Sequence, residues 1–169
     1  MPISFELSQS INCPTEKVFA FLSDLTNMPR WNYYIQSVTK ETPGVTDIGT
    51  IYKQKRPHDL LYYSVVEYHP PHHVAAQLPP PGPDMTYGFI LHQLNDDKTE
   101  LRYYWQLNLE NYSVLKYIPG FIRNGIMAIV RKIILSKTRP AVAANFSKLR
   151  TLLETGEVVL QDGRTERLP

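Results

Sequence analysis

Apolar and polar residues alternate along the first eleven positions of the chain. The apolar positions are Ile3, Phe5, Leu7 and Ile11. This period of two predicts a half-buried β-strand. Pro14 suits the first turn of a short helix. This helix should end at residues 27–29. A second helical turn around 29–34 should carry Trp31.

Six further segments favour extended structure, because Pro, Gly, Asn and Asp turns separate them. They span 35–42, 48–56, 60–69, 72–78, 85–94 and 99–110. In the last segment one face collects the apolar and aromatic residues Leu101, Tyr103, Trp105, Leu107 and Leu109. Short connections between successive strands predict an antiparallel meander.

The period changes after Asn111. Isoleucines at 122, 126, 129 and 133 follow the spacing of one helix face, and Phe146, Leu149 and Leu153 continue a similar row. Pro140 should interrupt this helix, because proline removes a hydrogen bond and clashes with the previous turn. We therefore predict two helical pieces, 120–138 and 139–155.

The chain has 169 residues, which fits one domain, and 43% of them are hydrophobic. We assign 1–155 to a single domain and 156–169 to a C-terminal tail, either flexible or a short strand with a turn at Asp162-Gly163. Eleven tyrosines are a surplus. Tyrosine has an apolar body and a polar tip, which suits half-wet cavity walls.

The order of elements resembles the helix-grip fold of the START-like/SRPBCC superfamily, and within it the polyketide cyclase/dehydrase and lipid-transport family. The motifs that carry the likeness are Pro14 to Asp24, Asn27 to Trp31, Ile48-Gly49-Thr50, Val66 to Pro71, and Asp97 to Leu101. The resemblance covers about residues 3–155. It implies an α+β domain in which a curved antiparallel sheet of about seven strands wraps around a long C-terminal helix.

The resemblance also implies a cavity between sheet and helix that binds a hydrophobic small molecule, lipid-like or polycyclic. Apolar walls with a few phenol hydroxyls suit an apolar ligand with one or two oxygens. The alternation and the helix spacing select the candidate ligand-binding residues Tyr52, Tyr62, Tyr87, Phe89, Leu91, Tyr103, Trp105, Ile126, Ile129 and Ile133. Trp31 matches the typical tryptophan of the family's second short helix and is a further candidate, as a cavity wall.

The stretch from Asn111 to Leu153 has eight Lys and Arg residues and no Asp or Glu. If the isoleucine row faces the sheet, other apolar residues remain on the outer side, namely Met127, Val130, Ile134 and Leu135. An apolar and basic helix face suits an anionic membrane surface or a protein partner such as a second copy. The candidate contact residues are Phe121, Ile122, Arg123, Arg131, Lys132 and Leu135. Nucleic acid is not expected, because the basic residues lack an aromatic stacking platform.

No phosphate loop, dinucleotide fingerprint, nucleophile elbow or paired-carboxylate motif occurs, so no cofactor is expected. Histidines 69, 72 and 73 cluster, but no carboxylate or cysteine partner is evident beside them, so no metal site is predicted. The single cysteine, Cys13, is expected to be an inert thiol. No signal peptide and no long apolar segment is visible, which predicts a cytoplasmic protein with, at most, peripheral membrane contact.

Three functions remain open. The first is a non-catalytic binder or carrier of a hydrophobic molecule that loads at a membrane. The second is a polyketide cyclase or dehydratase, which needs convergent polar groups in the cavity such as Tyr52, Tyr103 and Gln54. The third is an interaction module or homodimer that uses the C-terminal helix.

Overall fold

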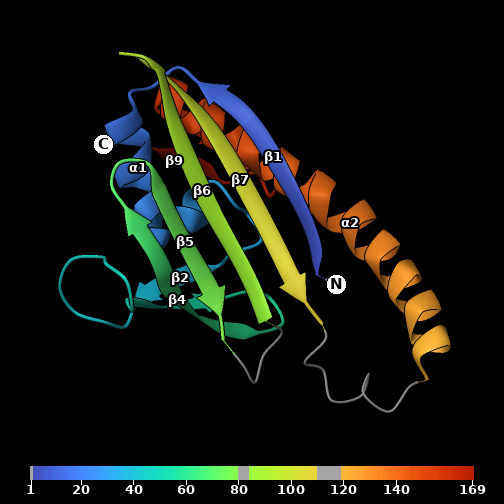
Figure 1. Cartoon of the computed structure of the whole chain (residues 1–169). Helices are drawn as coiled ribbons and strands as arrows, with labels where there is room; N and C mark the ends of the chain where they lie inside the picture. The colour runs from blue at the N-terminus through green and yellow to red at the C-terminus, as the bar shows by residue number, and fades with distance from the viewer. Residues whose placement is uncertain (1, 80–83, 110–118) are drawn as a thin grey trace.

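The computed structural model describes residues 2–79, 84–109 and 119–169, and Figure 1 shows a curved sheet packed against one long helix. The seven strands are antiparallel neighbours in the order β1-β7-β6-β5-β4-β3-β2. They are β1 (Ile3–Ile11), β2 (Ser37–Lys40), β3 (Ile51–Lys55), β4 (Leu60–His69), β5 (His73–Leu78), β6 (Asp84–Asn95) and β7 (Lys98–Asn108). The predicted α+β helix-grip class is confirmed.

Two short helical segments separate the first two strands. They are α1 (Thr15–Ser23) and the 3-10 helix η1 (Leu25–Arg30). Pro14 precedes α1, as expected. The second segment differs from the prediction, because η1 begins earlier and contains Pro29, while Trp31 is the residue just after it.

The inner face of the sheet forms most of the core. Cross-strand pairs on this face are Tyr87–Trp105, Phe89–Tyr103 and Leu91–Leu101 between β6 and β7. Each of these side chains is buried. The clean alternation of β7 in the sequence therefore identified the inward face correctly.

A β-bulge in β4 changes which side chains face inward. The register between β4 and β5 shifts between Val65 and Glu67. Before the bulge Tyr63 and Val65 are buried, and after it Tyr68 packs against the ring of Phe19. An extra residue moves the following side chains to the other face. Alternation alone placed Tyr62 among the cavity residues, and the structure instead exposes Tyr62.

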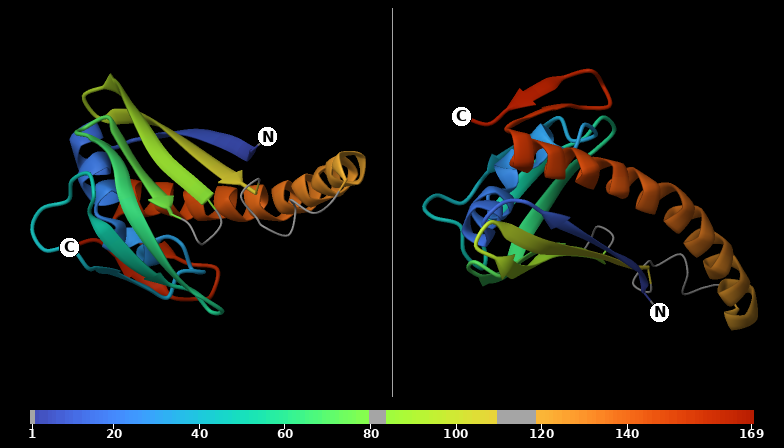
Figure 2. Two further views of the ribbon diagram at one scale, coloured as in Figure 1. Left: turned by 60° about the horizontal axis from the view of Figure 1, so that its bottom comes forward. Right: turned by 90° about the horizontal axis from the view of Figure 1, so that it is seen from above.

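The long helix α2 (Gly120–Thr155) is continuous, so the predicted division at Pro140 is wrong. Pro140 is exposed. Figure 2 shows α2 curving with its convex side away from the sheet. Hydrogen bonds lengthen on the solvent side of such a helix, so the bond that proline removes is accommodated by curvature.

The two halves of α2 have different surroundings. The C-terminal half packs on the sheet through Phe146, Leu149 and Leu152, which are buried. The N-terminal half extends past the sheet (Figures 1 and 2).

The orientation of the N-terminal half reverses the expectation. The isoleucines at 122, 126, 129 and 133 are 44%, 39%, 63% and 50% exposed, respectively. Partly buried residues that pack against the core occupy the other side, namely Met127, Val130, Ile134 and Leu135. Both rows have helical spacing, and only the inner one continues in phase with the buried Asn145, Leu149 and Leu152.

The C-terminal tail forms a hairpin of β8 (Glu157–Val159) and β9 (Thr165–Arg167). Gly156 ends α2 in the left-handed conformation with φ of 80°. Val158 and Leu160 are buried in the main core. Arg30 of η1 contacts Glu166 and donates to the Arg167 carbonyl, so the hairpin is held against η1.

Candidate functional site

A cavity of about 640 Å³ lies between the inner face of the sheet, the segment after η1 and the middle of α2. Its walls are largely aromatic. The aromatic lining residues are Trp31, Tyr33, Tyr34, Tyr63, Tyr87, Tyr103, Trp105 and Phe146. A concave site of this size with aromatic walls and few polar groups suits a small apolar molecule.

Trp31 is positioned by the short segment that precedes it. The Asp24 carboxylate accepts a hydrogen bond from the backbone N–H of Thr26 at 3.0 Å, which starts η1. The indole of Trp31 then packs edge-on against Phe146 of α2 and Phe89 of β6, with ring centroids 5.5 Å and 6.4 Å away. Trp31 therefore joins the helix and the sheet at one wall of the cavity.

The structure brings together four of the predicted ligand-binding residues in this lining: Trp31, Tyr87, Tyr103 and Trp105. Phe89, Leu91 and Tyr52 are buried but are not part of the lining. The Tyr52 hydroxyl lies 2.7 Å from the Thr46 hydroxyl, which satisfies it within the protein.

The other predicted ligand-binding residues lie elsewhere. Tyr62 faces outward because of the β4 bulge, and the three isoleucines Ile126, Ile129 and Ile133 are on the solvent side of α2. In their place α2 contributes Lys137, Thr138, Ala141, Val142, Asn145 and Phe146. Tyr63 was missed because only a bulge, which has no signal in the residue pattern of β4, turns it inward.

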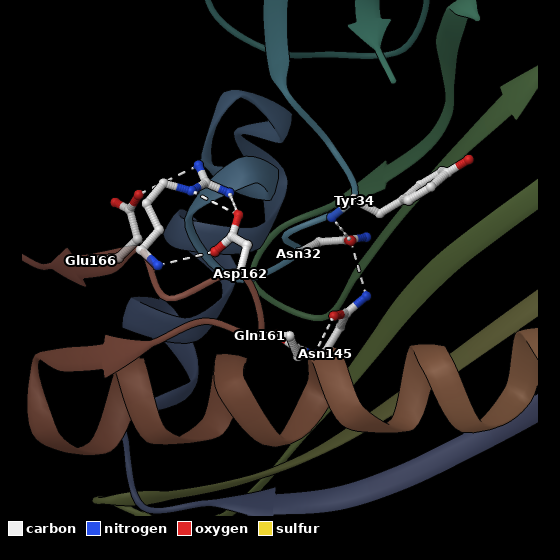
Figure 3. Close-up of polar contacts among 7 residues, drawn as sticks. Asn32, Tyr34, Asn145, Gln161, Asp162 and Glu166 are labelled. Carbon is white, nitrogen blue, oxygen red and sulfur yellow. Dashed lines mark hydrogen bonds and ion pairs between the residues drawn. The ribbon is translucent and has the colours of Figure 1, made fainter. Parts of the chain in front are cut away.

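A chain of amides links the cavity wall to the C-terminal hairpin (Figure 3). The buried Asn145 donates to the Asn32 side-chain oxygen at 2.9 Å, and its own oxygen accepts from Gln161 at 2.9 Å. The Asn32 oxygen also accepts from the backbone N–H of Tyr34 at 3.2 Å. These bonds fix the loop after η1 against α2 at the edge of the cavity.

Two cations line the cavity, Arg56 and Lys137. Arg56 donates from Nε to the Asp59 carboxylate at 2.6 Å, and this hydrogen bond raises the pKa of Arg56 and lowers that of Asp59. Lys137 forms no ion pair in the part of the chain that the structure describes. None of the described lining residues is Asp, Glu, His or Cys.

Burial sets the protonation of the cavity tyrosines. Removal from water raises the pKa of Tyr63, Tyr87 and Tyr103 well above the ordinary value, because the phenolate is poorly solvated there. These hydroxyls therefore stay protonated at neutral pH and act as hydrogen-bond donors rather than bases.

Of the clustered histidines, His69 and His73 pair across β4 and β5, and His72 lies in the turn between these strands. His73 Nδ1 lies 2.9 Å from the Glu67 carboxylate, a partner that the sequence did not reveal, and Nε2 lies 3.1 Å from the Tyr104 hydroxyl. No group of three metal-ligating side chains occurs within the described ranges. Cys13 is buried, and desolvation raises the pKa of its thiol, although Lys17 lowers it in part.

The predicted membrane or partner contacts separate into two groups. Ile122, Arg123, Arg131 and Lys132 are exposed on α2, whereas Leu135 is partly buried against the core. The Phe121 side chain lies outside the described residues. No helix within the described ranges is both long enough and apolar enough to cross a membrane.

The family model described as "Polyketide cyclase / dehydrase and lipid transport" matches residues 2–154. The chain belongs to this family. The resemblance to the polyketide cyclase/dehydrase and lipid-transport family predicted from the sequence is thereby confirmed. The family description names both cyclisation and lipid transport, so this membership leaves ligand binding and cyclisation both open. Comparison with curated proteins gives no significant match.

Three solved structures illustrate the fold of this family member. A START superfamily protein from Mycobacterium smegmatis has a TM-score of 0.64 at 13% identity. The alignment covers 89% of this chain and 98% of that protein. The Aha1 dimer from Colwellia psychrerythraea has a TM-score of 0.60 at 16% identity, with 91% and 98% covered.

The di-domain ARO/CYC BexL from the BE-7585A biosynthetic pathway has a TM-score of 0.63 at 13% identity, covering 88% of this chain. The chain spans about half of that di-domain protein, since 47% of it is covered. At these identities the three similarities show the fold alone.

Proposed function

We propose that this protein binds a hydrophobic small molecule in the aromatic cavity and carries it without converting it. The observation that supports this proposal is the cavity itself, which is walled by eight aromatic residues and contains no described acid, histidine or cysteine. A close-packed core would leave no such space. The family description, which includes lipid transport, agrees with a carrier.

Filling the cavity tests the proposal. Ala141 of α2 lines the cavity, so Ala141→Trp places an indole in it. We expect about tenfold weaker binding of the neutral fluorophore N-phenyl-1-naphthylamine, as its site is lost. The matched control is Ala143→Trp, an exposed position two residues away that is not part of the lining. Equal binding by both variants contradicts the proposal, and native mass spectrometry of the purified protein identifies any retained molecule.

The cyclase alternative is supported by the fold shared with an ARO/CYC protein. A cyclase or dehydratase has to move protons, and the described cavity offers only phenols whose pKa is raised, an amide set and two cations. Such groups polarise a carbonyl but do not abstract a proton at neutral pH. Turnover of a polyketone substrate by the purified protein would favour the enzyme.

For loading and unloading, we infer that the protein is cytoplasmic and binds an anionic membrane surface through the exposed isoleucine row of α2. Arg123, Lys132 and Lys137 flank this row, and none of them forms an ion pair within the described chain. Each basic group near an anionic surface contributes about 1 kcal/mol. Lys137 also lines the cavity, so the docked face and the cavity adjoin on one helix.

Vesicle co-sedimentation tests this contact. Ile129→Glu adds a charge at the most exposed isoleucine and should reduce binding to phosphatidylglycerol-containing vesicles by about tenfold. Val45→Glu is the control, because Val45 is 88% exposed in a loop outside α2. If the protein does not bind anionic vesicles, or binds pure phosphatidylcholine vesicles equally well, the electrostatic contact is contradicted.

A homodimer through the same row is the alternative, and one structural neighbour is a dimer. Pairing two copies of this face would bring its unpaired cations together, which opposes association. If the protein is a dimer and Ile129→Glu dissociates it, the isoleucine row serves self-association rather than membrane contact.

A further inference from the structure

Three buried polar side chains line the cavity without a side-chain hydrogen-bond partner among the described residues. Gln54, Tyr63 and Tyr103 are 5%, 3% and 7% exposed, respectively, and all three are part of the lining. None of their side-chain polar atoms hydrogen-bonds to any residue within 2–79, 84–109 and 119–169. The buried Tyr52 and Asn145 differ, because both are bonded within the protein.

These polar ends are open to the cavity rather than enclosed in the core. In the described chain, every fully enclosed side-chain nitrogen or oxygen has a hydrogen-bond partner. The unpartnered amide and hydroxyls must therefore reach the cavity space. Folded proteins rarely leave buried polar groups unsatisfied, since each one carries a desolvation cost. Oxygen or nitrogen atoms of a bound ligand would complete the hydrogen bonds of these groups.

The three groups come from neighbouring parts of the inner face. Gln54 pairs with Leu61 across β3 and β4, which makes Tyr63 its diagonal neighbour. The Tyr63 ring lies 5.3 Å from that of Tyr87, which in turn lies 6.4 Å from that of Tyr103. Proximity of Tyr63 also contributes to raising the pKa of Tyr103. One ligand can therefore meet all three groups.

The chemistry of the groups selects the ligand. Two protonated phenols donate, and the Gln54 amide donates and accepts, so the set matches oxygen acceptors better than donors. The surrounding walls present the aromatic faces of Trp31, Tyr87 and Trp105, which suit a ring system better than a flexible chain. Resting on the proposed ligand-binding function, we propose that Gln54, Tyr63 and Tyr103 form a subsite for the carbonyl oxygens of a fused-ring ligand.

A pair of compounds that differ by one carbonyl tests the subsite. Fluorenone and fluorene have nearly the same shape, and isothermal titration of the full chain measures both affinities. We expect fluorenone to bind about tenfold more tightly to the wild-type protein. Tyr63→Phe, Tyr103→Phe and Gln54→Leu should each reduce this preference about three- to tenfold while leaving fluorene binding unchanged.

Tyr52→Phe is the matched control, because it removes a buried hydroxyl that is outside the lining. It should leave both affinities unchanged, and thermal unfolding verifies that each variant is folded. Equal binding of fluorenone and fluorene by the wild-type protein overturns the subsite and leaves the carrier proposal standing. Weakening of both compounds alike in Tyr103→Phe also overturns it, since that result reports shape. Failure of both compounds to bind, together with unaltered fluorophore binding by Ala141→Trp, overturns the proposed function itself.

Discussion

Tyr104 lies over Gly88 on the outer side of the sheet, and this contact explains why glycine occupies a strand interior. A Cβ atom at Gly88 would lie 2.5 Å from the ζ-carbon and from the hydroxyl of the Tyr104 side chain. The same hydroxyl lies 3.1 Å from His73 Nε2. A glycine in a strand often marks such a close approach.

Gly88→Ala should therefore displace Tyr104 and break its contact with His73. Overpacking of this kind costs about 1–3 kcal/mol, and we expect the low end because only the flexible end of one side chain has to move. Urea unfolding measures the change. The control is Gly125→Ala in α2, where an added Cβ meets no atom within 4 Å. That substitution should raise stability by about 1 kcal/mol, as helix propensity predicts. A fully stable Gly88→Ala variant would contradict the importance of the contact.

At the scale of elements, periodicity predicted the strands and the existence of the long helix but not the orientation of its first half. Two apolar rows compete on α2, one of isoleucines and one containing Met127, Val130 and Ile134. Only three-dimensional contact with the sheet selects the second. In the same way, the inward face of β7 was readable from alternation, whereas the β4 bulge that turns Tyr63 inward depends on pairing with β5.

The local effect of Pro140 was likewise predicted correctly, but its effect on the whole helix was not. Pro140 removes one hydrogen bond from α2, as predicted, but the helix continues because the lost bond lies on its exposed side. The candidate site was therefore predictable where it depends on strand alternation, at Tyr87, Tyr103 and Trp105. Trp31, which follows η1, was predicted from the resemblance to the family. It was not predictable at Asn145, whose role depends on contacts with both Asn32 and the C-terminal hairpin.

The β8–β9 hairpin should be an integral part of the fold rather than a loose tail. Val158 is 4% exposed and packs in the core, while the next residue, Val159, is 51% exposed. Val158→Ala removes two buried methyl groups and should cost about 2 kcal/mol. Val159→Ala makes the same chemical change on the solvent side and should cost about 0.5 kcal/mol or less.

Thermal unfolding of these two variants gives the test. Equal melting temperatures would mean that the hairpin does not pack on the core in solution. A lower melting temperature for Val158→Ala, with reduced protection of the Asn145 side-chain amide from hydrogen exchange, would show that the hairpin supports the cavity edge through Gln161.

At the scale of the whole molecule, the cavity contains several buried phenols. Their burial makes the free energy of unfolding depend on pH in the alkaline range. The pKa values of Tyr63, Tyr87 and Tyr103 lie well above the ordinary value of 10.0 in the folded protein. In the unfolded chain the same groups release protons near pH 10. Above that pH the folded state binds more protons than the unfolded state, so the free energy of unfolding falls as pH rises. Below pH 10 this contribution is constant.

Each such tyrosine can lower the free energy of unfolding by up to about 1.4 kcal/mol per pH unit above pH 10. We expect the urea midpoint to fall steeply there, and Tyr103→Phe to make the fall shallower by about one third of the tyrosine contribution. Tyr62→Phe is the control, because it removes the hydroxyl of an exposed tyrosine outside the cavity lining. If the pH slopes of Tyr103→Phe and Tyr62→Phe are the same, the Tyr103 phenol ionises freely in the folded protein. Water would then solvate the cavity fully, and both the carrier proposal and the hydrogen-bonding subsite would lose the dry aromatic interior on which they depend.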